Sequence, residues 1–176
     1  MLVVCALAVA RAPLAAQVPA PAASPPSRAA IIAAARDIIQ SATYGTLGTV
    51  GLDGHPQARI VDPFAPDSAF TIWIATNPRT RKVAEIAREP RVTLLYFNAA
   101  AFEYVTVIGR AVADTSRREK AAHWKPSWKT LYADENRGAD YQLLRVTPSR
   151  LEVVSVRRQI VNDTVTWRPV SVALPE

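Results

Sequence analysis

FTIWIATNPRTRKVAEIAREPRVTLLYF, residues 70–97, is the stretch of this sequence that most strongly predicts its fold. Residues 70–75 and 91–97 are short apolar runs rich in β-branched and aromatic side chains, which is typical of buried strands. Residues 78–88 lie between them and begin with a proline, which suits the first turn of a helix. Pro90 ends the helix, because the residue before a proline avoids helical geometry. The stretch therefore predicts a strand, a helix and a second strand.

The start of this predicted helix carries several cations, including Arg81 and Lys82. A helix N-terminus has partial positive charge and free N–H groups, so cations there are unfavourable unless an anion binds. A phosphate would accept those N–H groups and charge-assisted bonds from the two cations. The hydroxyl of Thr76 or Thr80 would add a donor. The alternative is a solvated basic turn in which Arg81 pairs with Glu85 at i+4.

A further cation, Arg59, lies in the middle of the predicted strand QARIVDPF, residues 57–64. A charged side chain inside a strand usually faces water, and that is the simpler interpretation. In a barrel built from hairpins, however, this strand can lie beside the strand that leads to Asn77. Arg59 would then reach the same anion, and two elements would supply one phosphate site.

The rest of the chain predicts a mainly β protein of the α+β class, an antiparallel barrel with helices packed outside it. About seven strands are joined mostly by short turns, without the regular strand–helix alternation of a doubly wound sheet. The remaining predicted elements are a helix over 27–40, strands over 44–52, 104–114, 141–146 and 150–156, a short helix over 115–124, and a last hairpin strand over 164–168.

The N-terminal segment differs from the rest of the chain. Residues 1–16, with an apolar run at 2–10 and small residues before Gln17, are typical of a secretory signal peptide. The run is too short to span a bilayer, so no stable membrane insertion is expected. Residues 17–27 form a Pro/Ala-rich linker, and the folded domain is expected over 28–176. The protein is then periplasmic or secreted; without a functional signal it is cytoplasmic.

Composition excludes several classes of site. The 176 residues are 49% apolar and 20% charged, which fits one globular domain. Cys5 is the only cysteine, so disulfides are excluded from a mature chain that lacks the signal segment. His55 and His123 are the only histidines, and no metal site is expected. The formal net charge of +6 fits an anionic ligand, a nucleic acid or a soluble surface.

Three blocks of sequence together resemble the pyridoxamine 5'-phosphate oxidase-like family of FMN-binding split barrels, and within it the general-stress-protein branch. They are ARIVDPF at 58–64, the stretch at 70–97, and YVTVIGRAVAD at 104–114. The resemblance runs from about Ala42 to Val156. It implies a split β-barrel, FMN as cofactor, and a homodimer with the cofactor at the subunit interface.

The resemblance also implies roles for individual residues. The FMN phosphate would be held by Arg59, Arg81 and Lys82. The backbone of the second strand would face the flavin ring, the segment before the helix would line the ring and ribityl chain, and Tyr104 would reach the cofactor, often across the dimer interface. The cofactor-binding residues expected on this basis are Arg59, Ile60, Val61, Ala75, Thr76, Asn77, Thr80, Arg81, Lys82 and Tyr104.

The sequence departs from the oxidase at three places. Phe64 replaces a phosphate-contacting lysine, and Ala75 replaces an aromatic residue. The segment 157–159, Arg-Arg-Gln, does not reproduce the Arg-x-His that grips the pyridoxal substrate. The resemblance therefore supports FMN binding better than vitamin B6 chemistry, and it leaves room for the deazaflavin F420 or haem.

We expect an FMN-dependent oxidoreductase acting on a small organic substrate, with a non-catalytic flavin-, deazaflavin- or haem-binding module as the alternative. No catalytic group is identified. Trp124 and Trp128 either cover the barrel or form an aromatic wall over a planar substrate. Nucleic-acid binding is not expected, because two members of the necessary stacking face, Trp73 and Tyr96, have apolar neighbours typical of core residues.

Overall fold

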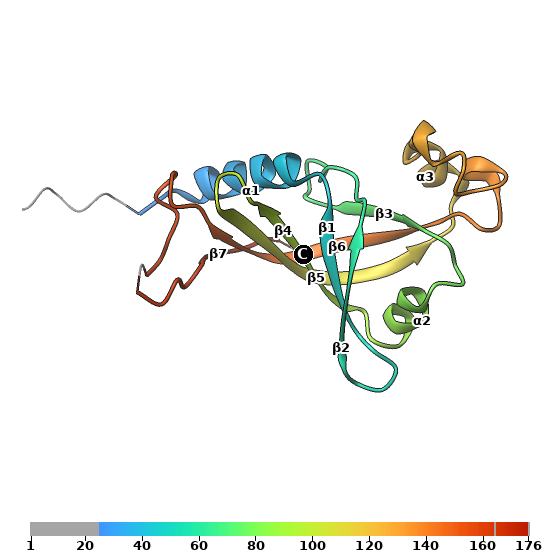
Figure 1. Ribbon diagram of the computed structural model, residues 1–176, viewed down its shortest axis with the longest axis horizontal. Coiled ribbons are helices and arrows are strands. Elements are labelled where there is room, and N and C mark those ends of the chain that lie inside the picture. The colour runs from blue at the N-terminus through green and yellow to red at the C-terminus, as the bar shows by residue number, and fades with distance from the viewer. Residues whose placement is uncertain (1–24, 164, 176) are drawn as a thin grey trace, which may run out of the picture.

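The computed structural model describes residues 25–163 and 165–175. A seven-stranded antiparallel sheet dominates this part of the chain, and helices lie outside it (Figure 1). The predicted signal peptide lies outside the described residues. The elements are α1 (Arg28–Ala42), β1 (Gly45–Val50), β2 (Pro56–Val61), β3 (Ile72–Thr76), α2 (Arg81–Arg88), β4 (Arg91–Asn98), β5 (Glu103–Asp114), α3 (Arg117–Ala122), the 3₁₀ turns η1 (Pro126–Trp128) and η2 (Glu135–Arg137), β6 (Gln142–Val154) and β7 (Val170–Ala173).

The strands follow the order β2-β1-β4-β5-β6-β3, and β7 pairs with β6 beside this path. The two edges of the sheet meet beyond the end of β2, where Pro63 forms an antiparallel bridge with Ile74. The backbone N–H of Phe64 also donates to the carbonyl of Trp73 at 2.8 Å. The sheet therefore curls into a barrel, which confirms the predicted antiparallel barrel with helices outside.

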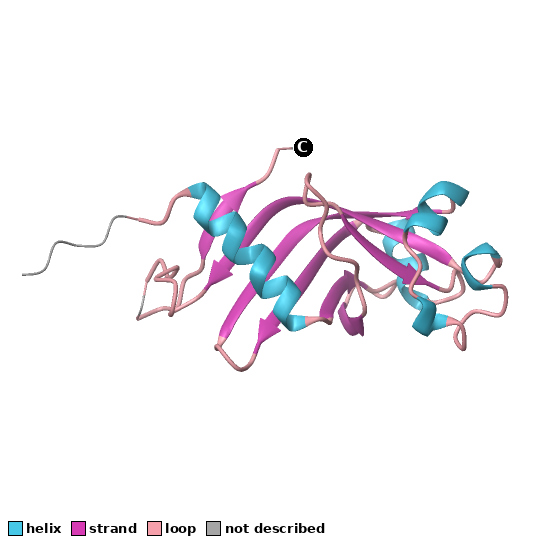
Figure 2. Ribbon diagram, turned by 90° about the horizontal axis from the view of Figure 1, so that it is seen from above, coloured by secondary structure: helices cyan, strands magenta, loops and turns pink. Residues whose placement is uncertain are grey.

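Helix α1 lies diagonally across the strands (Figure 2) and contacts β4, β5, β6 and β7. Its apolar stripe, which includes Ile31, Ala35 and Ile38, is buried against the sheet, as its helical spacing predicts. The side chain of Ser27 accepts a hydrogen bond from the N–H of Ala30 at 3.2 Å and caps the helix. Burial of this stripe holds α1 on the barrel.

The structure corrects three predicted elements. The two strands expected around Pro148 are one 13-residue strand, β6. Its first half pairs with β3 and its second half with β7. A register shift between Ile108 and Gly109 of the facing strand lets the proline remain inside the sheet.

The short helix and the final strand also differ from the prediction. Helix α3 ends at Ala122, and a separate 3₁₀ turn follows it. The last strand is β7, later in the chain than the predicted 164–168, and in that region only Asp163 and Arg168 form an isolated bridge. Thr164 lies outside the described residues. No helix in the part of the chain that the structure describes is long and apolar enough to cross a membrane.

Candidate functional site

The segment before α2 is a tight polar turn. The side chain of Asn77 accepts the N–H of Arg79 at 2.9 Å, which is an Asx turn. Thr80 is the residue before the helix, and its hydroxyl donates to the carbonyl of Asn77 at 2.8 Å and lies 3.0 Å from the hydroxyl of Thr76. The helix begins at Arg81 rather than at residue 78, because this turn occupies the expected first helical residues.

Arg59 points from β2 toward α2 and contacts Glu85. Its Nη2 lies 2.7 Å from Oε2 of the carboxylate, and its Nη1 donates to the hydroxyl of Thr49 on β1 at 2.5 Å. Thr49 in turn donates to Oε2 of Glu85 at 2.6 Å. Glu85 is fully buried, and the Arg59 side chain is 19% exposed. The strand arginine is therefore turned inward, and the simpler interpretation of a solvent-facing Arg59 is wrong.

Arg81 reaches the same carboxylate from one turn earlier on α2. Its Nε lies 2.9 Å from Oε1 of Glu85, although Oε1 has no well-aligned hydrogen bond among the described residues. The i, i+4 pair predicted as the alternative thus exists. Arg59 and Arg81 nevertheless converge, because the carboxylate of Glu85 forms an ion pair with each of them.

Lys82 completes the cation cluster, defined as Arg59, Arg81 and Lys82. Its ammonium has no ion pair within 4.0 Å and no hydrogen bond among the described residues, and the side chain is half-buried. Burial lowers the pKa of Lys82, the nearby charge of Arg59 lowers it further, and Glu85 opposes both. Burial alone would raise the pKa of Glu85, but bonds from Thr49 and Arg59 and the charges of the two arginines lower it.

The residues expected to line the flavin ring differ in exposure and in their place in the barrel. Ile60 is 68% exposed on the outer face of β2, whereas Val61 is buried in the core. Ala75 is half-buried against an aromatic cluster beside β3. Tyr104 lies on β5, three strands away from β2 in the sheet order. Within one chain, the structure does not bring Tyr104 to the cation cluster.

The family model described as "Pyridoxamine 5'-phosphate oxidase" matches residues 31–155. The chain belongs to the pyridoxamine 5'-phosphate oxidase family. A search of curated proteins found no match.

Several solved structures share the fold of this chain. A Clostridium acetobutylicum protein related to general stress protein 26 superposes with a TM-score of 0.68 at 17% identity, over 82% of this chain and 94% of that one. A pyridoxamine 5'-phosphate oxidase-related, FMN-binding protein of Nostoc punctiforme gives 0.56 at 17% identity, over 88% and 100%. A heme-binding protein of Mycobacterium smegmatis gives 0.57 at 20% identity, over 79% and 56%. At these identities the comparison shows the split-barrel fold.

Asp62, just after the end of β2, binds the chain segment from α3 to η2 through hydrogen bonds. This carboxylate accepts Nζ of Lys125 at 2.5 Å and the indole N–H of Trp128 at 3.2 Å. Trp128 is buried and Trp124 is half-buried, and their rings meet edge to face at 6.1 Å. This packing favours the interpretation that the two tryptophans cover the barrel; their contact with a substrate stays a prediction. The sequence reasoning missed Asp62, whose position at the end of a strand was the only signal.

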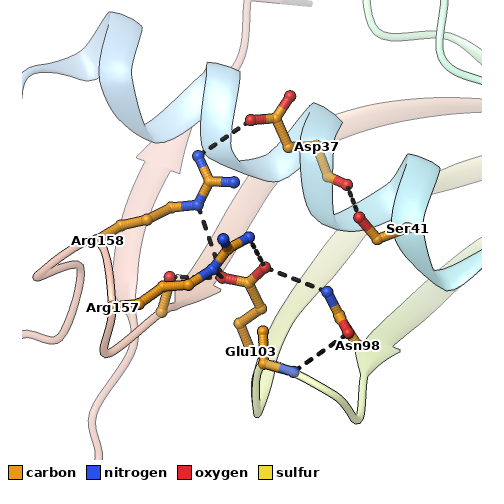
Figure 3. Close-up of polar contacts among 8 residues, drawn as sticks. Asp37, Ser41, Asn98, Glu103, Arg157 and Arg158 are labelled. Carbon is orange, nitrogen blue, oxygen red and sulfur yellow. Dashed lines mark hydrogen bonds and ion pairs between the residues drawn. The ribbon is translucent and has the colours of Figure 1, made fainter.

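Arg157 and Arg158 both bind carboxylates (Figure 3). Nη2 of Arg157 lies 2.7 Å from Oε1 of Glu103, and Arg158 pairs with Asp37 of α1 at 3.0 Å. Hydrogen bonds from Arg157, and a further one from Ser155, outweigh burial and lower the pKa of Glu103 to about 2. These arginines hold the C-terminal segment against α1 and β5.

A cavity of about 910 Å³ lies against the sheet. It is lined by residues of five strands, and no member of the cation cluster is among them. Thr49 lines the cavity and also accepts a hydrogen bond from Arg59, so the cavity adjoins the cation cluster. The lining residues are Gly48, Thr49, Val50, Pro56, Gln57, Ala58, Arg91, Val92, Thr93, Ile108, Gly109, Arg110, Thr147, Pro148 and Ser149.

Proposed function

We propose that this protein binds FMN through its terminal phosphate and acts as a flavin-dependent oxidoreductase on a small organic substrate. The main support is that β2 and α2 bring the three side chains of the cation cluster together. Two nitrogens of Arg59 bond to Thr49 and Glu85, and its other N–H groups have no acceptor among the described residues. The ammonium group of Lys82 also has no acceptor among the described residues. Three cations against one carboxylate leave two positive charges, which fit the charge of a phosphate monoester.

FMN, when bound, supplies the redox chemistry, and the protein supplies binding and orientation. The cation cluster would anchor the phosphate, and the hydroxyls of Thr76 and Thr80 lie beside it on the turn that leads into α2. Ala75 and the backbone of Ile60 and Val61 would face the ring.

We further propose that the protein is a homodimer with the cofactor at the interface. The family is often dimeric. Ile60, Thr46, Leu95 and Thr106 lie side by side across β2, β1, β4 and β5, on the same outer face. Ile60 is 68% and Leu95 39% exposed, so this face presents apolar side chains that none of the described elements covers. A second subunit on it would bring its own Tyr104 toward the cation cluster.

A non-catalytic flavin-, deazaflavin- or haem-binding module is the second candidate. Two observations favour it. No acid–base residue apart from Glu85 contacts the cation cluster among the described residues. In addition, a heme-binding protein of Mycobacterium smegmatis shares the fold. Turnover separates the two candidates, because a storage or sensing module holds its chromophore without oxidising any donor.

Titration of the purified protein with FMN and riboflavin tests the proposal. Binding should quench flavin fluorescence, and FMN should bind more tightly than riboflavin because only FMN carries phosphate. Arg59→Ala or Lys82→Ala should weaken FMN binding about tenfold or more and leave riboflavin unchanged.

Arg79→Ala is the matched control. Arg79 is exposed and precedes α2, and its side chain makes no ion pair among the described residues. Equal losses for all three variants, or equal affinity for FMN and riboflavin, would contradict the phosphate site. Mass and absorbance spectra of the protein as purified would identify any other cofactor.

A further inference from the structure

Glu85 occupies the centre of the site proposed to take the FMN phosphate. We propose that Glu85 is an internal counter-anion, which neutralises part of the charge of the cation cluster while no cofactor is bound and lowers the affinity for phosphate in return. The inference rests on the proposed function, because it concerns the same site. It explains why a fully buried carboxylate lies where an anion is expected to bind.

The first support is the way Glu85 is held. Its Oε2 accepts bonds from Thr49 of β1 and Arg59 of β2, while Glu85 itself belongs to α2. One carboxylate therefore joins helix α2 to the β1–β2 hairpin, whose contacting residues lie 36 and 26 positions earlier in the chain. A buried carboxylate is stable only when charged donors and hydroxyls replace its water shell, and this one has both.

The second support is what the site would be without that charge. Arg59 is 19% exposed, and Lys82 is half-buried with its pKa lowered by burial and by the charge of Arg59. Removing Glu85 would leave partly buried like charges facing one another with no anion between them. Such an arrangement destabilises the cofactor-free protein until an external anion enters.

The third support is that the three cations differ in how strongly they are bonded to Glu85. Arg59 is bonded to Thr49 and Glu85 on its inner side. Arg81 is 65% exposed, and its contact with Oε1 is an ion pair without hydrogen-bond alignment. Lys82 makes no bond to Glu85 at all. Arg81 and Lys82 are therefore free to turn toward a phosphate while Arg59 stays in place.

Opposite effects on stability and affinity follow from this arrangement. Glu85 stabilises the empty site, but its charge repels an incoming phosphate at short range. Glu85→Gln should lower the melting temperature of the cofactor-free protein by several degrees. The same variant should bind FMN at least tenfold more tightly than the wild type, with riboflavin unchanged. If Glu85 had a purely structural role, Glu85→Gln would lower both the melting temperature and the affinity for FMN.

The experiment measures thermal unfolding of wild type and Glu85→Gln alone, with FMN, and with inorganic phosphate, and titrates both with FMN and riboflavin. Glu89→Gln is the control, because Glu89 lies at the end of the same helix and pairs with Arg91 away from the cluster. If Glu85→Gln is unfolded without ligand, FMN or inorganic phosphate should restore its fold, and failure of both overturns the inference.

The outcomes also separate the two claims. FMN affinity that is unchanged or weaker in Glu85→Gln overturns the inference and leaves the proposed function standing. If the wild type does not bind FMN, the proposed function fails, and inorganic phosphate decides the inference alone. Greater stabilisation of Glu85→Gln than of wild type by phosphate then supports it, and equal or smaller stabilisation overturns it.

Discussion

Glu103 and Glu85 are both fully buried carboxylates, and each is held by an arginine and a hydroxyl. They differ in what surrounds them. Glu103 has Arg157 and Ser155 as hydrogen-bond donors, with Arg158 nearby, and all three belong to one segment that packs against β5. Glu103 therefore stabilises the packing of this segment on β5, whereas Glu85 lies among cations that have N–H groups without acceptors.

Replacement of Glu103 by Gln should lower the free energy of unfolding at neutral pH by about 3 kcal/mol, because Arg157 and Arg158 lose a buried counter-ion. The pKa of Glu103 falls from 4.5 to about 2 on folding. Its stabilising contribution is therefore complete above about pH 4.5 and is lost as the pH falls toward 2. Urea unfolding across this range should show a shallower acid loss for Glu103→Gln than for the wild type.

Glu152→Gln is the control for this prediction, because Glu152 pairs with Arg150 at a more exposed site. Its unfolding free energy should change by no more than about 0.5 kcal/mol. Parallel acid curves for the wild type and Glu103→Gln would show that Glu103 titrates normally.

At the scale of elements, β6 organises the barrel because it pairs with three strands. It joins β5 along its whole length, β3 along its first half and β7 along its second half. Pro148 lies in the middle and donates no ladder hydrogen bond. The facing strand accommodates it with a register shift next to Gly109. The backbones approach so closely there that only a glycine fits.

Gly109→Ala should therefore destabilise the fold by about 2 kcal/mol or more. A Cβ at this position would lie 2.2 Å from the carbonyl oxygen of Thr147 and 2.7 Å from Cα of Pro148, both backbone atoms. Gly48→Ala is the matched control, because its Cβ would meet its nearest neighbour, the carbonyl oxygen of Thr93, at 3.5 Å. Chemical denaturation measures both. An equal loss for the two variants would contradict the close approach at Gly109.

At the scale of the whole molecule, the barrel leaves one apolar outer face uncovered. The row from Ile60 to Thr106 crosses four adjacent strands. One chain has no element to cover it among the described residues, since the buried stripe of α1 packs in the core and α2 lies beside the β1–β2 hairpin (Figure 1). Such a face is the simplest surface for a self-complementary dimer.

Leu95→Arg should therefore shift the protein from dimer to monomer, with the dimer dissociation constant raised at least about 100-fold. The effect is large because a two-fold interface contains the change twice. Light scattering after size exclusion measures the mass, and circular dichroism checks the fold. Leu131→Arg is the control, because Leu131 is 67% exposed in the segment between η1 and η2. A Leu95→Arg protein that remains dimeric would exclude this face as the interface.

Most of the strands, the helix α1 and the cations of the cluster can be read from the amino-acid sequence alone. Each of these depends on local spacing: a period of two in strands, a stripe in a helix, or residues within one turn. The pair between Arg81 and Glu85 was foreseen for the same reason, since i and i+4 meet on any helix.

How these parts meet depends on the three-dimensional fold. Arg59 and Glu85 are 26 residues apart, Glu103 and Arg157 are 54 apart, and Asp62 and Lys125 are 63 apart. No local pattern predicts such contacts, because they depend on strand register and on which face of a helix packs against the barrel. The same holds for β6, where a proline suggested a break and the facing glycine removed the need for one. Burial of charge is thus set by packing, while the order of the elements is already present in the chain.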